Sequence, residues 1–577
     1  MKTLILDGDT LPALAIARSL GKQGITIDIA SHAQAPIAGS SKFVDEVLHY
    51  PSPLDDTSAF LGWIEKLLNT GRYQLVMPAT ERTIVPLARF FDGTEFASKI
   101  CMPALNALNC VLDKAETARL ADECEVPQPG SWQLSTSQDL DIIVQEMTYP
   151  VVVKPGRSIS EGDQRVPLTV CYAHNDDQLR KITDDLLKHA HVVLQQYFKG
   201  IGVGIELIAD KGEVIYAFQH QRVHEMPLTG GGSSYRKSVE IDSDLLDASK
   251  RLIRKLVWHG VAMVEFMRGA NDEYVLVEIN GRFWGSLPLA VAAGADFPAM
   301  LHQLYTQGSV TTKQAYKREI YCRKLSSDLK WLEAVLRKDA DPRLVKIPDR
   351  SSAFKDFAKA FRPRDHFDAQ SWGDPVPGLL DLQHILSDYW RRLTGLLQER
   401  RYLRNALRDS AFTKIEEAAA SSRRILYLCY GNINRSAAAH ALSESEIEAG
   451  RLEFKSAGFH KMEGRPPDPR MTRIAHQHGV DMQAMRSSIV TPELVDWADL
   501  IFVMEAAQIA TLEQISTNAK GKTYLLGGLC KGGAIEIPDP YNKHETVYRS
   551  VYDTIEQCIT QLAQILKNRL GGASDAE

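Results

Sequence analysis

One short segment constrains the fold of this 577-residue chain more than any other, because it joins a strand, a tight loop and a helix. The apolar run 425–428 is typical of a buried strand, and the alanine-rich run 437–442 is typical of a helix. Between them lies Cys429-x5-Arg435-Ser436. A loop that leads into a helix N-terminus presents backbone N–H groups and the positive end of the helix dipole, and both attract phosphate. The segment therefore predicts a phosphate-binding loop at the end of a strand.

The side chains of this loop suit nucleophilic attack on phosphorus. Arg435 offers a planar fork that matches two phosphate oxygens. The same positive surroundings favour the thiolate form of Cys429. Ser436 is placed to donate a hydrogen bond to the sulfur, and Asn432 is a residue type that tolerates a left-handed conformation. The other predicted phosphate-loop positions are Tyr430, Gly431, Ile433 and Asn434.

A phosphatase of this kind also needs a general acid to protonate the leaving oxygen. Asp539 lies in a proline-stiffened segment, 537–541, just before a helix expected over 546–570. With these features the chain resembles the low-molecular-weight protein tyrosine phosphatase family over about residues 423–570. The segments Ser456–Gly458, Gly464–Arg470 and Asp499–Glu505 also match that family, in order. The resemblance implies Cys429 as nucleophile, Arg435 as phosphate clamp and Asp539 as general acid, with a phosphocysteine intermediate.

The loop departs from the pattern of that family at two places. The second cysteine usual beside the arginine is Asn434, and the proline usual after the serine is Ala437. The aromatic residue that commonly walls the substrate cleft falls at about Lys461. We therefore expect the phosphatase chemistry to be retained, with fewer surfaces for a phosphotyrosine ring to stack on.

In the first half of the chain, two glutamates are expected to face each other on a β-hairpin. The apolar strands 261–268 and 274–279 flank Asn271-Asp272, and a turn centred there places Glu265 opposite Glu278. Asn280 follows on the same face of its strand. Facing carboxylates repel unless a cation lies between them, and a set of oxygen ligands favours magnesium. The hairpin therefore predicts a Mg²⁺ site.

Three further segments come before this hairpin. Lys114 begins a helical stretch at 113–117, Lys154 ends an apolar strand that starts near residue 150, and a second apolar strand over 192–196 breaks at Gly200. In this order, the segments and the hairpin resemble the ATP-grasp superfamily over about residues 1–305. The resemblance implies that ATP contacts Lys114, Lys154, Gln195, Gln196, Tyr197 and Phe198, and that Glu265, Glu278 and Asn280 hold Mg²⁺.

This second resemblance implies activation of a carboxylate by ATP. An acyl phosphate would form, and an amine or a similar nucleophile would attack it. Arg222 and Arg282 are the expected substrate-binding residues. The acidic residue that usually contacts the ribose is not evident, because the hinge contains Gln195-Gln196, and the proline expected between Asn280 and Arg282 is Gly281.

The predicted fold class is α/β with four parts. We expect a Rossmann-like pre-ATP-grasp domain over 1–109, an α+β ATP-grasp domain over 110–311, a helical linker segment over 312–422 and a doubly wound parallel-sheet phosphatase domain over 423–570. The linker segment is rich in arginine and lysine and contains no catalytic pattern.

Composition limits the partners and the location. The net charge is -6, which argues against nucleic acid, and there is no run of eighteen apolar residues that would span a membrane. Eight scattered cysteines without a CxxC motif fit reduced thiols, so we expect a cytoplasmic protein. The expected partners are a small carboxylate, an amine and a phosphorylated protein or metabolite.

Three hypotheses of function follow from the sequence. The first is a bifunctional enzyme that combines an ATP/Mg²⁺-dependent carboxylate–amine ligase with a cysteine-dependent phosphatase. The second is a phosphatase regulated by a non-catalytic nucleotide-binding module. The third is an arsenate reductase-like C-terminal domain, which needs resolving thiols that only Cys530 and Cys558 offer.

Overall fold

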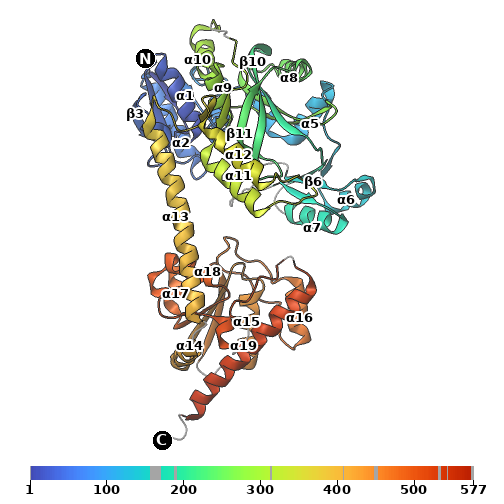
Figure 1. The fold of residues 1–577 in the computed structure, drawn as a ribbon, viewed down its shortest axis with the longest axis vertical. Coiled ribbons are helices and arrows are strands. Elements are labelled where there is room, and N and C mark those ends of the chain that lie inside the picture. The colour runs from blue at the N-terminus through green and yellow to red at the C-terminus, as the bar shows by residue number, and fades with distance from the viewer. Residues whose placement is uncertain are drawn as a thin grey trace. The chain divides into compact units, whose positions relative to one another are not determined.

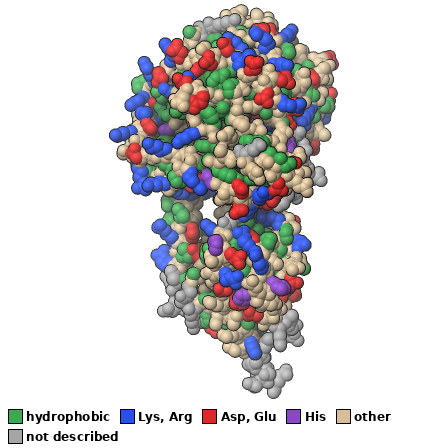
Figure 2. Space-filling model, turned by 90° about the vertical axis from the view of Figure 1, so that its right-hand side faces the viewer, with side chains coloured by type: hydrophobic (Ala, Val, Ile, Leu, Met, Phe, Trp, Pro, Cys, Tyr) green, Lys and Arg blue, Asp and Glu red, His purple; other side chains and the backbone are tan. Residues whose placement is uncertain are grey.

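The computed structural model describes residues 2–155, 170–187, 191–311, 315–406, 409–447, 452–530, 534–541 and 543–572. The chain forms two compact units, Met1–Ile385 and Leu386–Glu577 (Figure 1). The long helix α13, Pro375–Ala406, contains the boundary between them. On the face drawn in Figure 2, basic and acidic side chains are interspersed, as expected for a chain with a small net charge.

Unit 1 begins with a parallel sheet of strand order β3-β2-β1-β4. Its strands β1 and β2 are almost wholly buried, which explains their continuous apolar sequences. The elements are β1 (Lys2–Ile5), α1 (Leu11–Lys22), β2 (Ile27–Ser31), β3 (Val44–His49), α2 (Thr57–Asn69), β4 (Tyr73–Met77), α3 (Glu81–Phe91) and α4 (Leu105–Leu112). The alternation of strands and helices confirms the predicted α/β architecture of this region.

A small antiparallel sheet of order β5-β8-β6-β7 follows. Val151, Val153, Val192 and Leu194 form its core together with helices on one side. The elements are α5 (Lys114–Glu123), β5 (Ser131–Leu134), α6 (Ser137–Ile143), β6 (Val151–Pro155), β7 (Cys171–Ala173), α7 (Asp176–Leu187) and β8 (Val192–Gln196). The two predicted apolar strands are thus β6 and β8, which are adjacent. The polar loop that follows Lys154 in the sequence lies outside the described residues.

A seven-stranded sheet of order β13-β12-β9-β10-β11-β14-β15 completes unit 1. Apolar side chains on its two faces belong to two separate cores, so that the strands are buried from both sides. The elements are β9 (Ile201–Asp210), β10 (Glu213–Met226), β11 (Gly232–Val239), α8 (Ser243–Lys255), β12 (Gly260–Arg268), β13 (Tyr274–Asn280), α9 (Leu287–Ala293), α10 (Phe297–Gln307), β14 (Tyr321–Arg323), α11 (Leu325–Arg337), α12 (Arg350–Ala358) and β15 (Asp365–Phe367).

The segment expected to be a helical linker differs from that expectation in its first part. Its strands β14 and β15 extend the seven-stranded sheet beyond β11. Buried ion pairs fix it there: Arg236 on β11 pairs with Asp368, and Arg18 on α1 pairs with Asp374. A buried charge must be paired, so these contacts hold the segment against unit 1. The sequence alone gave no sign of such long-range partners.

Unit 2 is built on a parallel sheet of order β17-β16-β18-β19. Side chains of β16 alternate between two cores, one under α14, α15, α16 and α19 and the other under α17 and α18. The elements are α14 (Asp409–Ser421), β16 (Arg424–Cys429), α15 (Arg435–Glu446), β17 (Glu453–Gly458), α16 (Pro469–Gln477), α17 (Pro492–Trp497), β18 (Leu500–Val503), α18 (Ala506–Ile515), β19 (Thr523–Leu525) and α19 (Glu545–Gly572). Helices on both faces of a parallel sheet confirm the predicted doubly wound fold.

Short 3-10 turns, η1 to η6, occur at Ile37–Ser40, Ala97–Lys99, Val144–Glu146, Lys359–Phe361, Thr517–Ala519 and Leu526–Leu529. Over the described ranges, none of the helices combines the length and the apolar character that a membrane crossing requires.

Candidate functional sites

The predicted phosphate loop lies at the centre of the sheet of unit 2. β16 lies between β17 and β18, and Cys429 is its last residue. At the end of such a central strand, the connections to its two neighbouring strands run in opposite directions. Ligands bind at this switch point in open α/β sheets. α15 begins at Arg435, and no described side chain caps its N-terminus. Its first N–H groups therefore remain available to an anion.

Two hydrogen bonds reach the sulfur of Cys429, which is 2% exposed. The backbone N–H of Asn432 donates to Sγ at 3.2 Å, and Oγ of Ser436 donates to Sγ at 3.0 Å. Hydrogen bonds to the charged form favour that form, so this geometry favours a thiolate. The predicted contact between Ser436 and the sulfur is present.

Asn432 holds the loop in shape. Its φ is +52°, the left-handed conformation predicted for it. Its Nδ2 donates to Oγ of Ser436 at 2.9 Å, and its Oδ1 accepts from the backbone N–H of Ser488 at 2.9 Å. Gly458, at the end of β17, lies against the loop: a Cβ at this position would lie 2.8 Å from the backbone oxygen of Tyr430. The loop is therefore fixed from both sides.

Arg435 is buried and held by the surrounding backbone and acids. Its Nη1 donates to Oε1 of Glu505 at 2.6 Å and to the backbone oxygen of Ile537 at 2.8 Å. Its Nη2 lies 3.0 Å from Oδ2 of Asp539. The side chain of Arg435 is 1% exposed and that of Asp539 is 39% exposed. The predicted clamp and the predicted acid are thus adjacent, with the acid on the solvent side.

A second arginine, to which the sequence motifs assign no role, also contacts the loop. Nη2 of Arg465 donates to the backbone oxygen of Gly431 at 2.6 Å. Burial lowers the pKa of Arg465, although the charge of Cys429 acts in the opposite direction. Tyr430 at the loop entrance is exposed, and Asp468 donates its backbone N–H to the oxygen of Ile433. The loop residue Asn434 is buried.

In unit 1, the predicted pair of glutamates is present. Glu265 on β12 pairs with Glu278 on β13, and Asn280 lies two pairs further along, opposite Met263. Nδ2 of Asn280 donates to Oε1 of Glu278 at 3.1 Å and contacts Oε1 of Glu265 at 3.4 Å. Burial raises the pKa of Glu265. With the Asn280 side chain turned so that its amide oxygen replaces Nδ2, the two carboxylates and this oxygen are the hard ligands that suit Mg²⁺, so the donor set fits this ion.

Arg222 is engaged with these acids. One Nη donates to Oε1 of Glu225 at 2.9 Å and to the backbone oxygen of Gly231 at 3.0 Å, and the other contacts Oε2 of Glu265. Its guanidinium therefore supplies positive charge beside the carboxylate pair. The role predicted for it, binding a substrate carboxylate, stays a prediction.

Lys114 and Lys154 line one small cavity of about 90 Å³, together with Glu278 and Asn280. Nζ of Lys114 donates to the backbone oxygen of Pro155 at 3.1 Å. Burial, and then the charge of Lys114, lowers the pKa of Lys154 to about 8. Two partly desolvated ammonium groups in one cavity repel each other unless an anion lies between them. A polyphosphate would neutralise this repulsion.

The four predicted hinge residues lie in different surroundings. Gln195 lines the lysine cavity, and its Oε1 accepts from Nζ of Lys154. Nε2 of Gln196 donates to Oγ1 of Thr148 at 3.1 Å. The hydroxyl of Tyr197 donates to the backbone oxygen of Leu344 at 2.7 Å, and Phe198 packs beside Gly200.

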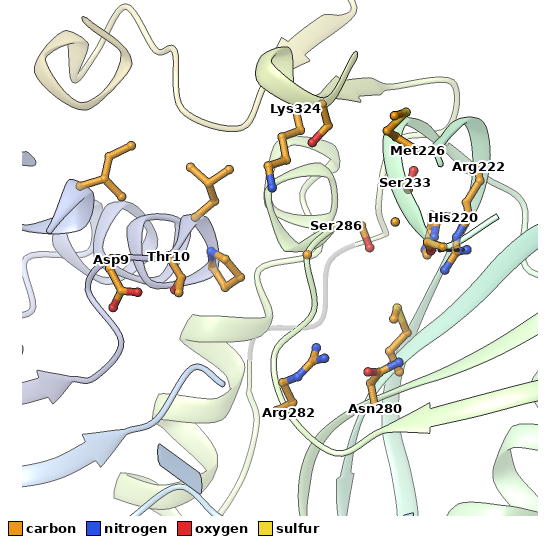
Figure 3. Close-up of a pocket in the computed structure, with 18 of the residues that line it drawn as sticks. Asp9, Thr10, His220, Arg222, Met226, Ser233, Asn280, Arg282, Ser286 and Lys324 are labelled. Carbon is orange, nitrogen blue, oxygen red and sulfur yellow. Dashed lines mark hydrogen bonds between the residues drawn. The ribbon is translucent and has the colours of Figure 1, made fainter. Parts of the chain in front are cut away.

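A larger cavity of about 710 Å³ lies on the other side of the carboxylate pair. Figure 3 shows Asp9 and Thr10 at the start of α1 on one wall, with His220, Arg222 and Asn280 on the strands opposite. Arg282 lines the same cavity, and its Nε lies 3.3 Å from Oε1 of Glu81. Glu278 and Asn280 line both cavities. Glu278 and Asn280 therefore lie between the two lysines and the larger cavity.

Comparison with known proteins identifies both units. Residues 424–571 match the family model described as low molecular weight phosphotyrosine protein phosphatase. The low molecular weight protein-tyrosine-phosphatase Etp of Escherichia coli (strain K12) is 33% identical over 142 residues, which are 25% of this chain and 93% of that protein. The chain belongs to the low molecular weight phosphotyrosine protein phosphatase family. The protein-arginine-phosphatase of Geobacillus stearothermophilus is also 33% identical, over 144 residues, 25% of this chain and 96% of that protein.

The other matches concern unit 1. Residues 188–327 match the model described as ATP-grasp in the biosynthetic pathway with Ter operon. The crystal structure of N5-carboxyaminoimidazole synthetase from Staphylococcus aureus is similar over 62% of this chain and 97% of that chain, with 14% identity and a TM-score of 0.47. The chain thus combines an ATP-grasp ligase-like domain with a low molecular weight phosphatase domain, and both belong to enzyme families.

Sequence reasoning missed several residues of the two domains. In the phosphatase domain these are Glu505 and Arg465, which contact the clamp and the loop. In the ATP-grasp domain they are Glu206 and Ser286, which contact each other. Glu505 and Arg465 lie within segments that matched the family, but nothing in the spacing indicated which residue they contact. The alternating glycines Gly202 and Gly204 were the available signal for the residues of the ATP-grasp domain.

Proposed function

We propose that the protein is a bifunctional enzyme: an ATP- and Mg²⁺-dependent ligase that joins a carboxylate to an amine or a similar nucleophile, and a cysteine-dependent phosphomonoester hydrolase. The observation that carries the ligase proposal is that Glu278 and Asn280 line both the lysine cavity and the larger cavity. A phosphoryl group held by lysines on one side of these residues can reach a carboxylate held on the other.

In the ligase, Lys114 and Lys154 hold the phosphates of ATP, and Glu265, Glu278 and Asn280 hold Mg²⁺. When bound, Mg²⁺ neutralises the negative charge that develops on the transferred phosphoryl group. Arg282 and Arg222 orient the substrate carboxylate, which attacks the γ-phosphorus to give an acyl phosphate. The nucleophile then displaces phosphate from the carbonyl carbon.

In the phosphatase, the thiolate of Cys429 attacks phosphorus while Arg435 and the loop N–H groups bind the equatorial oxygens. Asp539 protonates the leaving oxygen and then deprotonates the water that hydrolyses the phosphocysteine. The distance of 3.0 Å between Asp539 and Arg435 supports this role, because the acid adjoins the phosphate clamp. A phosphorylated protein or metabolite is the proposed substrate.

The ligase is tested with the Cys429→Ser variant, in which the phosphatase does not release phosphate. Mg-ATP is supplied with pooled amino acids and small carboxylates, and nucleotide products are followed by phosphorus NMR. We expect ADP and phosphate only with particular pools, and none from the Glu278→Ala variant of the same background. ATP binding without turnover in any pool would favour the second hypothesis, a nucleotide-binding module that regulates the phosphatase.

The phosphatase is tested with two aryl phosphates that differ in leaving group. We expect Asp539→Asn to slow hydrolysis of phenyl phosphate more than that of p-nitrophenyl phosphate, because the better leaving group depends less on protonation. Equal slowing of both substrates would contradict the acid role. Because similar relatives are named for tyrosine and for arginine phosphatase activity, phosphotyrosine and phosphoarginine peptides are compared in the same assay.

A further inference from the structure

His220 and Ser286 line the larger cavity, and the buried carboxylate of Glu206 contacts both of them. His220 on β10 is 1% exposed, and its Nδ1 lies 2.9 Å from Oε1 of Glu206 on β9. Glu206 is fully buried, and its Oε1 accepts a hydrogen bond from Oγ of Ser286 at 2.7 Å. Oε2 of Glu206 has no hydrogen-bond partner among the described residues. The cost of burying such groups suggests a function beyond stability.

Two glycines on β9 create the space for the side chains of β10. Gly204 pairs with His220 on one side and with Glu265 on the other. A Cβ on Gly204 would lie 2.4 Å from Cε1 of His220, and a Cβ on Gly202 would lie 2.6 Å from Cδ of Arg222. The imidazole therefore lies across the bare backbone of β9, in the direction of the carboxylate strands. Only glycine at position 204 allows this arrangement.

The orientation of the imidazole determines what it can do. Nδ1 and Oε1 of Glu206 are 2.9 Å apart but are not aligned for a hydrogen bond, so the carboxylate acts through its charge. A negative charge beside Nδ1 favours the tautomer with hydrogen on Nδ1, which leaves Nε2 with a lone pair. His220 lines the larger cavity together with Ser286, Glu278 and Asn280, and Figure 3 shows it with Ser286 and Asn280 around the same space. A proton acceptor thus borders the space in which the proposed ligase holds its carboxylate substrate.

We propose that His220 is the base that deprotonates the attacking amine, with Glu206 and Ser286 as positioning residues. This inference rests on the proposed ligase function. An amine is mostly protonated at neutral pH and has no lone pair in that form, so one proton must leave before it attacks. Nε2 of His220 takes this proton, and the free amine then attacks the carbonyl carbon. The bond between that carbon and the phosphate oxygen breaks, and the phosphate leaves with the electron pair and with the second proton of the amine nitrogen, as hydrogen phosphate. The imidazolium, paired with Glu206, then returns its proton to water.

The test compares two nucleophiles that differ in their need for a base. Hydroxylamine is largely uncharged at neutral pH, whereas ammonium must lose a proton. The Cys429→Ser protein receives Mg-ATP, the carboxylate pools described above, and either hydroxylamine or ammonium chloride. We expect His220→Asn to lower the rate of amide formation from ammonium by about 10²- to 10⁴-fold while hydroxamate formation stays within a few-fold of the parent.

His224 provides the matched control. It lies on the same strand, is buried, and pairs with a carboxylate, with Nδ1 2.8 Å from Oδ1 of Asp328. Its ring stacks on Trp331. We expect His224→Asn to change both nucleophile rates equally, through stability alone. We expect Gly204→Ala and Glu206→Gln to resemble His220→Asn, because the first displaces the imidazole and the second removes the charge that orients it.

The outcomes separate this inference from the ligase proposal. No hydroxamate from the parent protein with any pool contradicts the ligase itself. If the parent protein forms hydroxamate but no amide from ammonium, the proposed role of His220 is overturned, because the site then supplies no base for the ammonium ion. Loss of both products in His220→Asn overturns it too and assigns His220 to carboxylate binding or folding. A rise of the variant's amide rate at high pH, where free ammonia prevails, supports the base.

Discussion

Oγ of Ser436 donates a hydrogen bond to Sγ of Cys429 over 3.0 Å. The hydroxyl stabilises the thiolate more than the thiol, because a hydrogen bond to a charged acceptor is the stronger one. Loss of the hydroxyl should therefore make the thiolate a poorer leaving group in the second step, the hydrolysis of the phosphocysteine.

We expect Ser436→Ala to lower kcat for p-nitrophenyl phosphate by roughly ten- to a hundred-fold, the effect of losing about 1.5–3 kcal/mol of charge-assisted bonding. Alkylation of Cys429 by iodoacetamide should also become slower. Ser443→Ala is the control, because this buried serine on the same helix bonds Tyr427 and not the thiol. An unchanged alkylation rate in Ser436→Ala would contradict the role of the hydroxyl.

Gly458 adjoins the phosphate loop so closely that a side chain there would push the loop backbone. A Cβ would lie 2.8 Å from the oxygen of Tyr430 and 3.0 Å from the nitrogen of Asn432. We expect Gly458→Ala to reduce phosphatase activity strongly and to lower the free energy of unfolding by about 1–3 kcal/mol. Gly395→Ala, on an open helix face, should leave activity unchanged. Activity and urea denaturation measure both effects.

Glu505 positions the phosphate clamp through its bond of 2.6 Å to Arg435. Glu505→Gln keeps the size of the side chain but removes the charge that holds the guanidinium. We expect KM for p-nitrophenyl phosphate to rise several-fold, with a smaller change in kcat. The rise in KM should be about tenfold at most, because Glu505 is partly exposed and its charge is screened by solvent. Glu513→Gln is the control, since Glu513 accepts its bond from Tyr402 instead. A fall in kcat alone would argue against a positioning role.

The pairing of Glu265 with Glu278 illustrates how far sequence reasoning reaches. The predicted pair is confirmed, but residues nearer the turn are one position out of step: Phe266 pairs with Leu276 and Met267 with Val275. A register shift between Glu265 and Phe266 restores the predicted pair. Strand alternation and a turn motif therefore gave the correct partners, whereas the irregularity depends on packing that no local pattern encodes.

Local sequence patterns could not predict the roles of residues whose partners lie far away in the sequence. Arg222 was predicted to bind substrate, yet it contacts Glu225 and Glu265, which only the folded sheet brings to it. The loop around Cys429 was more predictable, because a strand, five residues and a helix N-terminus define its geometry locally. Glu505 contacts Arg435 from 70 positions away, and such a contact follows from topology alone.

The two thiols that an arsenate reductase-like reaction would need contact each other. Sγ of Cys530 lies 2.8 Å from Sγ of Cys558, and a hydrogen bond from Cys558 lowers the pKa of Cys530. We expect no thiol-dependent arsenate reduction by the protein, and unchanged p-nitrophenyl phosphate hydrolysis in Cys530→Ser. Arsenate turnover that disappears in Cys530→Ser would instead support the third hypothesis. A coupled assay with a thiol reductant measures this.

Lys154 makes nucleotide binding depend on pH. Its pKa is lowered to about 8, first by burial and then by the charge of Lys114. Below that pH the ammonium is charged and attracts phosphate, and above it the free protein must take up a proton to regain this charge. We therefore expect the affinity for Mg-ATP to be flat below about pH 8 and to fall by up to about tenfold per pH unit above it.

The Lys154→Arg variant removes the titration, since a guanidinium stays charged over the whole range. Its affinity should therefore be independent of pH, whatever its absolute value, in calorimetric titrations from about pH 6 to about pH 10. Lys250→Arg is the control, because Lys250 is half exposed on α8 and pairs with Asp247. If affinity in Lys154→Arg falls as steeply above pH 8 as in the parent, another group is responsible and Lys154 does not contact the phosphates.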